Sequence, residues 1–409
     1  MDTVQIRIRG LNKFHVATWA LFNQDFHPRK FAELSRNELT QARNPRVPYL
    51  RHFVLHGGDG ELFRPKVEIF ESANVEKGLT EYDLVITFSI PQLLNENSLQ
   101  EIAPSDSYRV FDTLRERLSN LGISTLTEHI KNGTVSVAHF CKNIILPPEI
   151  RFRSVSAELS KTDMGKAYDT SEEIMQRGTN NNEIVRIRCG TREWICYNKI
   201  EDLKNHKGKG AGRRRTQLEK DLFAVYALDG LEVFRYEYRL NKAQTIKSEI
   251  NSILGRPYPT PIVFNDLFTE GLWKTVLLNS WEKLIMRPEN QLALLGGDDK
   301  LALLHHILHK AESKERSAHS QNQALVSYSL AVAIKDHGVK TIRQELARGW
   351  SNKADDRLTE KLEAAASAME DLSFSDGLSF IDRELRRFNS TTLDSFPKKM
   401  ALDKSKRTL

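Results

Sequence analysis

Three short segments of the chain carry polar side chains whose identity and regular placement suit catalysis or binding. Each alternates apolar and polar residues in the manner of a β-strand, so its polar side chains share one face. Together they supply a histidine, tyrosines, acids and basic groups, residue types that can act as acids, bases, nucleophiles or metal ligands. The segments are residues 135–144, 194–203 and 234–242.

The third segment has the clearest pattern. Arg235, Glu237 and Arg239 alternate along the chain and therefore lie on one face of the predicted strand. A row of cation, acid and cation could hold a metal ion or a phosphate group. The same row is also typical of a solvated strand with cross-strand ion pairs, and the residues alone favour this plainer interpretation.

His139 and Tyr197, the candidates on the other two segments, can also be explained as ordinary structural residues. A single imidazole such as His139 is more often a structural group than a metal ligand, and it would need Glu237 or another acid nearby to act. Tyr197 is a weaker signal still, because tyrosines are common on half-buried strands.

Taken in order, the segments resemble the replication initiation proteins of filamentous phages and rolling-circle plasmids. Residues 197–203 are similar to the family's Tyr-x-Lys-x-x-Glu-Leu motif, and residues 235–242 to its Arg-Tyr/Phe-Glu-x-Arg-Leu/Ile-Lys motif. Residues 89–99 resemble its Ser-x-Pro-Lys-Leu-Leu-x-Gly-Asn-Asn-Leu signature, and residues 264–281 resemble the helical segment that follows. The resemblance covers roughly residues 60–285.

The chain departs from the family pattern at four places. His139 stands where an aspartate is usual, and Asp202 where a glutamate is usual. Gln92 and Glu96 replace a lysine and a glycine. The last two changes bear on details of the site more than on the class of protein, whereas His139 and Asp202 keep open a catalytically inactive member of the same fold.

The resemblance implies that a tyrosine attacks a DNA phosphodiester, becomes linked to the 5′ end, and leaves a 3′-OH that primes replication. Tyr197 matches the attacking tyrosine of the filamentous-phage branch, and Tyr236 that of the plasmid branch. We expect Tyr197 to be the nucleophile and keep Tyr236 as the alternative. Lys199 lies two residues on, where it could lower the pKa of the phenol or hold the phosphate.

A divalent metal, Mg²⁺ or Mn²⁺, is also implied as a cofactor. His139 and Glu237 are the first candidates for ligands, with Asp202 next and Glu68 weaker. Imidazole suits Mn²⁺ better than Mg²⁺, because carboxylate and water oxygens are the ligands that Mg²⁺ prefers.

A basic, glycine-containing stretch between residues 204 and 215 is expected to contact DNA phosphates. Its glycines are not a phosphate-binding loop, because no Gly-Lys-Ser/Thr follows, so we expect no ATPase or helicase activity. The residues expected to bind DNA are Lys207, Lys209, Arg213, Arg214, Arg215, Arg235 and Arg239.

The predicted fold class is α+β. Residues 1–255 are rich in strand patterns and form the nicking domain, built on an antiparallel sheet of the HUH-like replication-initiator type, single or duplicated. Residues 256–395 are predicted helical. Within them, helices at 326–336 and 341–347 on either side of a glycine form either a helix-turn-helix or, more simply, two packed helices. Residues 396–409 are predicted to be a basic tail.

The slightly basic composition is compatible with a polyanionic partner. The 409 residues carry 60 basic and 54 acidic side chains, a net charge of +6. Three cysteines are too few for a disulfide framework, and neither a signal peptide nor a membrane span is recognised, so a cytoplasmic location in a bacterial host is expected. Expected partners are origin DNA, single- and double-stranded, and a host helicase or polymerase; a homodimer is left open.

Two other functions compete with nicking. One is a catalytically inactive, sequence-specific DNA-binding protein of the same fold, such as a copy-control repressor. The other, weaker, is an RNA-binding protein that uses basic strands and aromatic side chains. Nicked circles with protein on the 5′ end would distinguish the first hypothesis from binding alone.

Overall fold

The computed structural model describes most of the chain, and the statements below refer to that part. The described residues are 1–17, 19, 23–24, 49–55, 62–74, 79–162, 173–177, 183–204, 217–285, 287–294, 303–304, 307, 318–347, 360–363 and 375–398.

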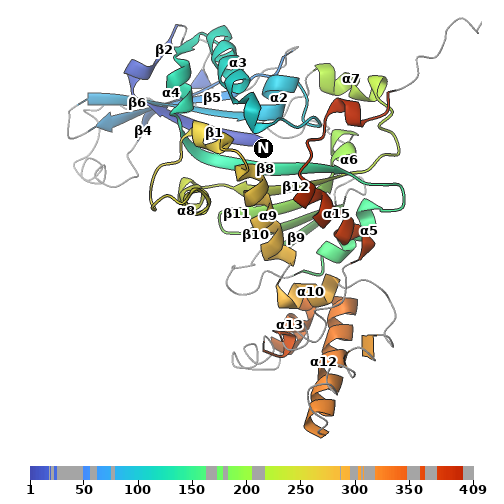
Figure 1. Ribbon diagram of the computed structural model, residues 1–409. Helices are drawn as coiled ribbons and strands as arrows, with labels where there is room; N and C mark the ends of the chain where they lie inside the picture. Colours follow the sequence, from blue (N-terminus) through green and yellow to red (C-terminus); the bar gives the residue numbers. More distant parts are fainter. Residues whose placement is uncertain are drawn as a thin grey trace, which may run out of the picture.

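One large antiparallel sheet organises the molecule (Figure 1). Its strand order among the described residues is β3-β4-β5-β6-β1-β8-β12-β11-β10-β9. The strands are β1 Thr3–Arg9, β3 Asn23–Gln24, β4 Tyr49–Leu55, β5 Lys66–Asn74, β6 Leu79–Ser89, β8 Thr134–Ile145, β9 Glu173–Arg177, β10 Glu183–Cys189, β11 Arg192–Asn198 and β12 Val233–Leu240. A separate pair, β2 Phe14–Val16 and β7 Ile123–Thr125, lies beside it. The predicted α+β class, a mixture of helices and antiparallel sheet, is confirmed.

Helices occur between and after the strands. They are α2 Ile90–Asn95, α3 Ser107–Asn120, α4 Thr127–Lys131, α5 Phe152–Leu159, α6 Lys199–Lys204, α7 Gln217–Val225, α8 Ala243–Leu254, α9 Leu272–Ile285, α10 Pro288–Leu294, α12 Ala318–His337, α13 Val339–Ala347 and α15 Asp376–Arg387. No helix of the described chain combines the length and the apolar character that crossing a bilayer requires.

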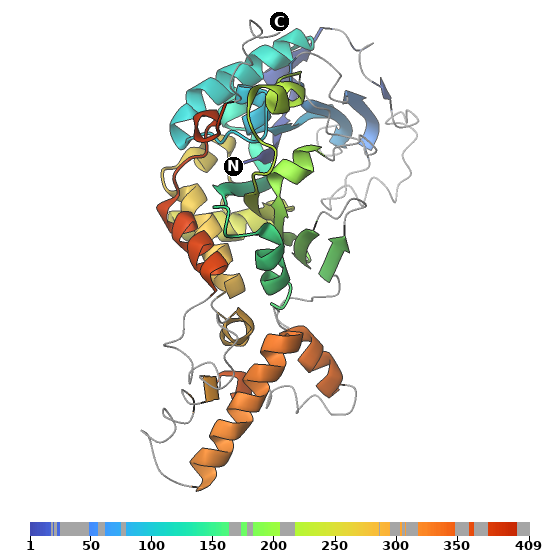
Figure 2. The same ribbon diagram turned by 90° about the vertical axis from the view of Figure 1, so that its right-hand side faces the viewer.

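One face of the sheet is apolar and covered by helices. Figure 2 shows α9 and α15 together on the same side of the strands. Alternate residues of β12, such as Phe234 and Tyr236, point to this side. The ring centroid of Trp281 on α9 lies 6.5 Å from that of Phe234 and 5.3 Å from that of Tyr236. This layer forms the main core, in which aromatic rings meet edge to face.

The opposite face carries polar side chains at the alternating positions. Residues directly opposite each other on neighbouring strands share a face. Tyr197 of β11 and Asn143 of β8 both lie opposite Arg235 of β12, and His139 of β8 lies opposite Arg239. The period of two therefore collects polar candidate side chains of three strands on one side of the sheet.

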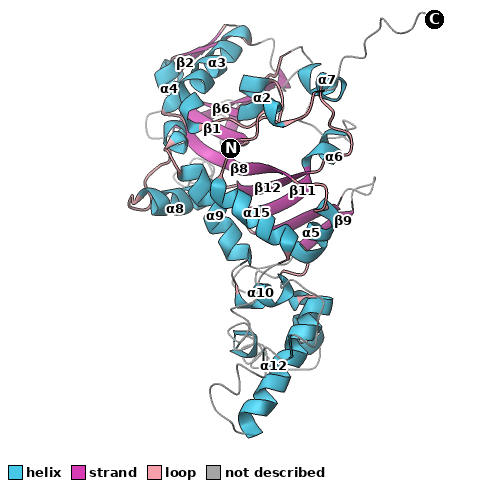
Figure 3. Ribbon diagram, turned by 45° about the vertical axis from the view of Figure 1, so that its right-hand side comes forward, coloured by secondary structure: helices cyan, strands magenta, loops and turns pink. Residues whose placement is uncertain are grey.

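The predicted helical region, residues 256–395, is divided between two cores. Helices α9 and α15 pack in the main core beneath the sheet. Helices α10, α12 and α13 have a hydrophobic cluster of their own, which includes Ile334 and Val339, and they extend away from the sheet (Figure 3). The predicted boundary at residue 255 does not coincide with this division, because a helical pattern shows which face is apolar but not what it packs against.

The helix pair predicted at 326–336 and 341–347 is present within α12 and α13. Gly338 alone joins the two helices, with φ +81°. A helix-turn-helix normally has a turn of about three or four residues, so the geometry favours the plainer packed pair. The predicted basic tail also begins later than expected, because Phe396 is buried against Leu222 and Leu228; residues 399–409 lie outside the described residues.

The core beneath the sheet gives a stability prediction. Trp281→Ala removes an indole that is 1% exposed, so we expect the free energy of unfolding to fall by about 3–5 kcal/mol. Urea denaturation measures this change. The control is Tyr108→Ala, an aromatic residue that is 69% exposed, which should change stability by less than about 1 kcal/mol. Equal losses in the two variants would contradict the assignment of Trp281 to the core.

Candidate functional site

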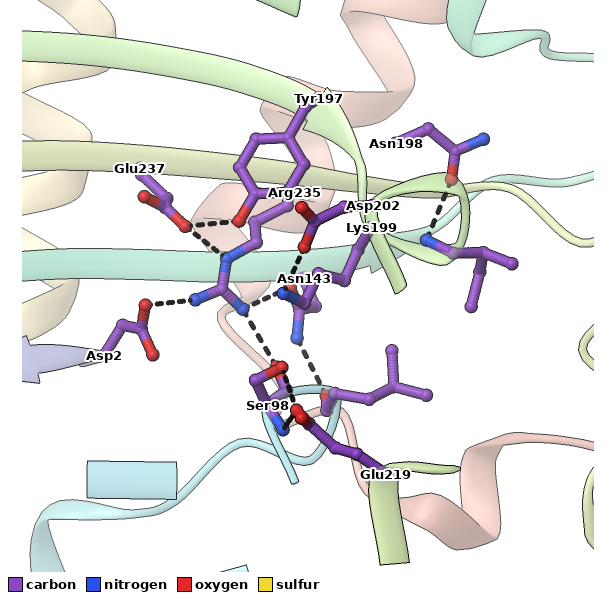
Figure 4. Close-up of polar contacts among 12 residues, drawn as sticks. Asp2, Ser98, Asn143, Tyr197, Asn198, Lys199, Asp202, Glu219, Arg235 and Glu237 are labelled. Atoms are coloured by element: carbon purple, nitrogen blue, oxygen red, sulfur yellow. Dashed lines mark hydrogen bonds and ion pairs between the residues drawn. The ribbon is translucent and has the colours of Figure 1, made fainter. Parts of the chain in front are cut away.

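The candidate site lies on the polar face where β11 and β12 run side by side. Tyr197 is the second-last residue of β11, and its hydroxyl donates a hydrogen bond of 2.6 Å to Oε1 of Glu237 on β12 (Figure 4). Tyr197 is 9% exposed and Glu237 1%. The structure thus brings together the predicted nucleophile and one predicted metal ligand.

Glu237 is held between two arginines of its own strand. Arg235 Nε lies 2.6 Å from Oε1, and Arg239 Nε lies 2.8 Å from Oε2. Burial by itself would raise the pKa of Glu237, but the two guanidinium groups, with the hydrogen bond from Tyr197, hold that pKa well below its usual value. The carboxylate is therefore ionised at neutral pH and is a weak proton acceptor.

Arg235 extends this network across the sheet. Its guanidinium is 1% exposed and reaches Asp2 Oδ2 at 2.9 Å, the backbone oxygen of Ser98 at 3.1 Å and Asn143 Oδ1 at 3.2 Å. These partners come from the residue just before β1, the segment after α2, and β8. Arg235 was predicted to bind DNA; its burial and its four protein partners give it an internal role instead.

Lys199 lies at the start of α6, directly after the strand that carries Tyr197. Its side chain is fully buried, its Nζ is 2.8 Å from Asp202 Oδ2, and it lies 5.6 Å from the centroid of the Tyr197 ring. The ammonium group is thus placed over the face of the ring. Asp202, a predicted metal ligand, is engaged with Lys199.

His139 lies on the same face as Glu237, on β8. Its Nε2 is 3.0 Å from Asn241 Oδ1. Burial, together with the charge of Arg239, lowers the pKa of His139, while the charge of Glu237 acts in the opposite direction. The imidazole is therefore neutral at pH 7.

The predicted metal ligands do not form a metal site in this arrangement. Within the described residues, no cluster of three or more histidine, cysteine, aspartate or glutamate side chains could hold an ion. Glu237 is shared by two arginines and Asp202 is paired with Lys199, so a cation would have to displace basic partners from both. The donor set does not fit a divalent ion here, and metal dependence stays a prediction.

Tyr236, the alternative nucleophile, lies on the other face of the sheet. It is fully buried, its hydroxyl is 2.8 Å from Ser280 Oγ, and its ring packs against Trp281. Burial raises the pKa of this phenol well above its usual value. Because neighbouring residues of a strand point to opposite faces, Tyr236 cannot reach the carboxylate beside it, and it is not positioned to attack DNA.

The remaining predicted site residues are dispersed. Lys207, Lys209 and Arg213–Arg215 lie outside the described residues. Arg239, with 24% of its side chain exposed, is the most accessible arginine of the β12 row and also reaches Glu193 at 3.3 Å. Glu68 pairs with Lys66 at 3.0 Å on β5, and four strand-to-strand steps separate β5 from β12. Glu68 is thus not part of this site.

Four residues of the network were not predicted from the sequence: Asp2, Ser98, Asn143 and Asn241. Asn143 had a usable signal, because it follows His139 at an even spacing and so shares its face. Asp2 and Ser98 had none, because their contacts with Arg235 join positions far apart in the chain.

Comparisons with protein-family models, curated proteins and solved structures find no match to this chain.

The first site prediction concerns the charge of Glu237. Glu237→Gln leaves two buried or half-buried guanidinium groups without their carboxylate, so we expect the free energy of unfolding at pH 7 to fall by about 3–5 kcal/mol. Chemical denaturation checks this. Glu201→Gln, at an exposed ion pair with Lys204, is the matched control and should change stability by less than about 1 kcal/mol. A Glu237→Gln variant as stable as that control would refute the role of the carboxylate.

The second site prediction concerns pH. The pKa of Glu237 is lower in the folded than in the unfolded state, so its stabilising effect is full above about pH 4.3 and is lost as pH falls towards the folded pKa. Glu237→Gln lacks this component. Chemical denaturation at a series of pH values measures the difference in free energy of unfolding between wild type and variant. This difference should be constant from pH 7 to about pH 5 and should become smaller below about pH 4. A difference that widens on acidification would contradict the sign of the shift.

Proposed function

We propose that this protein binds DNA at a replication origin and cuts one strand with Tyr197, as an initiator of rolling-circle replication. One observation carries the proposal: the Tyr197 hydroxyl is hydrogen-bonded at 2.6 Å to a carboxylate that two arginines flank, on the polar face of an antiparallel sheet. The sheet is, in this proposal, a nicking domain of the HUH-like type.

The reaction is an exchange of oxygens on phosphorus. The phenol oxygen of Tyr197 bonds to phosphorus, the bond from phosphorus to the 3′ oxygen breaks, and that oxygen leaves as a hydroxyl with the proton that the phenol gives up. The product is a 5′-phosphotyrosine ester and a free 3′-OH that primes synthesis. The reverse attack by a 3′-OH rejoins the strand without ATP, because the ester keeps the energy of the broken bond.

The residues of the network have distinct parts in this step. Glu237 orients the hydroxyl by accepting its hydrogen bond, and its low pKa makes it a positioning group rather than the final proton acceptor. Arg239, partly exposed beside Glu237, offers N–H donors and positive charge to the non-bridging oxygens as charge develops on them. The ammonium group of Lys199 lies over one face of the Tyr197 ring and so limits the motion of the ring toward that side.

A second candidate is a DNA-binding protein of the same fold that does not nick. The burial of the Tyr197 hydroxyl favours it, because only 9% of the residue is exposed and the phenol must turn outward to meet a phosphodiester. Both candidates share origin DNA as the partner and a cytoplasmic location in a bacterium. A host helicase or polymerase is a proposed partner of the initiator only.

The nicking assay separates the two candidates. Purified protein is incubated with a supercoiled plasmid carrying the DNA that flanks its coding sequence, with Mg²⁺ or Mn²⁺. Wild type should yield nicked circles with protein on the 5′ end. Tyr197→Phe should lose the adduct and reduce nicking about a thousandfold or more while binding the same DNA, because only the attacking oxygen is removed.

Tyr236→Phe is the matched control, since it removes the neighbouring phenol oxygen from the opposite face. It should nick at the wild-type rate. An adduct that persists in Tyr197→Phe would overturn the assignment of the nucleophile. DNA binding by wild type without any nick would overturn the nickase and support the second candidate.

A further inference from the structure

A cavity of about 550 Å³ lies between β4, the end of α3 and the segment just before β5, at a part of the sheet remote in strand order from β11 and Tyr197. This volume falls within the range of roughly 300–1,000 Å³ that is typical of small-ligand sites. The described residues that line it are Leu55, Leu62, Phe63, Arg64, Arg117, Asn120 and Leu121.

The lining combines apolar walls with two cations. Leu55, Phe63 and Leu121 supply an aliphatic and aromatic surface, and Arg64 and Arg117 supply guanidinium groups. Arg64 is exposed, and within the described chain no carboxylate is paired with it. The apolar walls favour a planar or aliphatic part of a ligand. The two guanidinium groups favour an anionic part, and the planar fork of N–H donors on each matches the oxygens of a phosphate group.

The two walls of the cavity are fixed by one carboxylate. Glu96 accepts a hydrogen bond of 2.6 Å from the backbone N–H of Phe63 and pairs with Arg117 at 2.7 Å. Glu96 ends α2 in the left-handed region, with φ +53°. The side chain of Arg117 is 14% exposed, so this wall is largely ordered before any ligand arrives. Such pre-ordering reduces the entropy that binding has to overcome.

The segment that holds the cavity also contacts the tyrosine site. Ser98, two residues after Glu96, accepts a hydrogen bond from Arg235 at 3.1 Å and, through its N–H and hydroxyl, bonds Glu219 at 2.9 and 2.7 Å. Six strand-to-strand steps separate β4 from β11, which is roughly 30 Å at about 4.8 Å a step. A single strand of DNA would cover that distance with several nucleotides.

We propose that the cavity binds one nucleotide unit, with its base against Leu55, Phe63 and Leu121 and its phosphate on Arg64 and Arg117. A base offers π faces to an aromatic side chain, and such stacking tolerates any base. The nucleotide comes either from a bound single strand, distant from the scissile bond, or from solution. The first source rests on the proposed DNA-binding function, and the second does not.

The test uses the full chain and two probes. Calorimetry measures binding of thymidine 5′-monophosphate, with thymidine and inorganic phosphate as partial ligands, and fluorescence anisotropy measures binding of a labelled single-stranded oligonucleotide. Arg64→Ala should weaken thymidine monophosphate binding about tenfold, through loss of a charge-assisted contact, and should leave the weaker binding of thymidine unchanged. Arg115→Ala, on the exposed side of α3 with 54% of its side chain accessible, should bind as wild type.

The two probes distinguish the two sources of the nucleotide. Weakening of both probes by Arg64→Ala assigns the nucleotide to a bound strand, and weakening of the monophosphate alone assigns it to a free nucleotide. If neither probe is weakened, or if Arg115→Ala weakens them equally, the cavity is not a nucleotide site. Nicking by Tyr197 is scored separately on the same variants, so loss of the cavity with intact nicking overturns only this inference.

Discussion

The buried carboxylate of Glu237 is the group on which the rest of the site depends. A lone carboxylate in the interior of a sheet would be strongly destabilising, and here it is compensated by guanidinium groups on both sides and by the phenol of Tyr197. Arg235 extends the compensation to Asp2, Ser98 and Asn143, so one chain of charges and hydrogen bonds joins β12 to β1, to β8 and to the segment after α2. The position of the phenol is thus set by groups from both halves of the sheet.

The alternation of side chains along a strand decides which groups can act. Tyr197 lies directly opposite Arg235 in the register of β11 and β12, and it faces the charged network. Tyr236 lies one residue further along β12 and faces Trp281 and Ser280 in the core. Two phenols on paired strands therefore have different environments: one is hydrogen-bonded to an ionised acid, and the other is buried beside Trp281, where burial strongly favours its neutral form.

Charge at this site is balanced within the protein. Arg186 and Arg239 both reach Glu193, Arg239 also reaches Glu237, and Arg235 reaches Asp2. A phosphate bound here as proposed would compete with carboxylates for the arginines, and Arg239, with 24% of its side chain exposed, is the more accessible of the two arginines that flank Glu237. The cavity beside Arg64 differs in this respect, because one of its two arginines has no paired carboxylate in the described chain.

The α+β class, the three strand patterns that carry the candidate residues and the shared face of Arg235, Glu237 and Arg239 can be predicted from the sequence alone, because they follow from side-chain periodicities of two and 3.6 that local residues set. Three of the site's features depend on three-dimensional packing: the hydrogen bond of Tyr197 to Glu237, the buried ion pair of Arg235 with Asp2, and the core position of Tyr236. Packing also brings α9 and α15 beneath the sheet, whereas α12 and α13 form a separate cluster. Strand register and helix packing arise from contacts between residues far apart in the chain, and no local pattern encodes which distant surfaces meet.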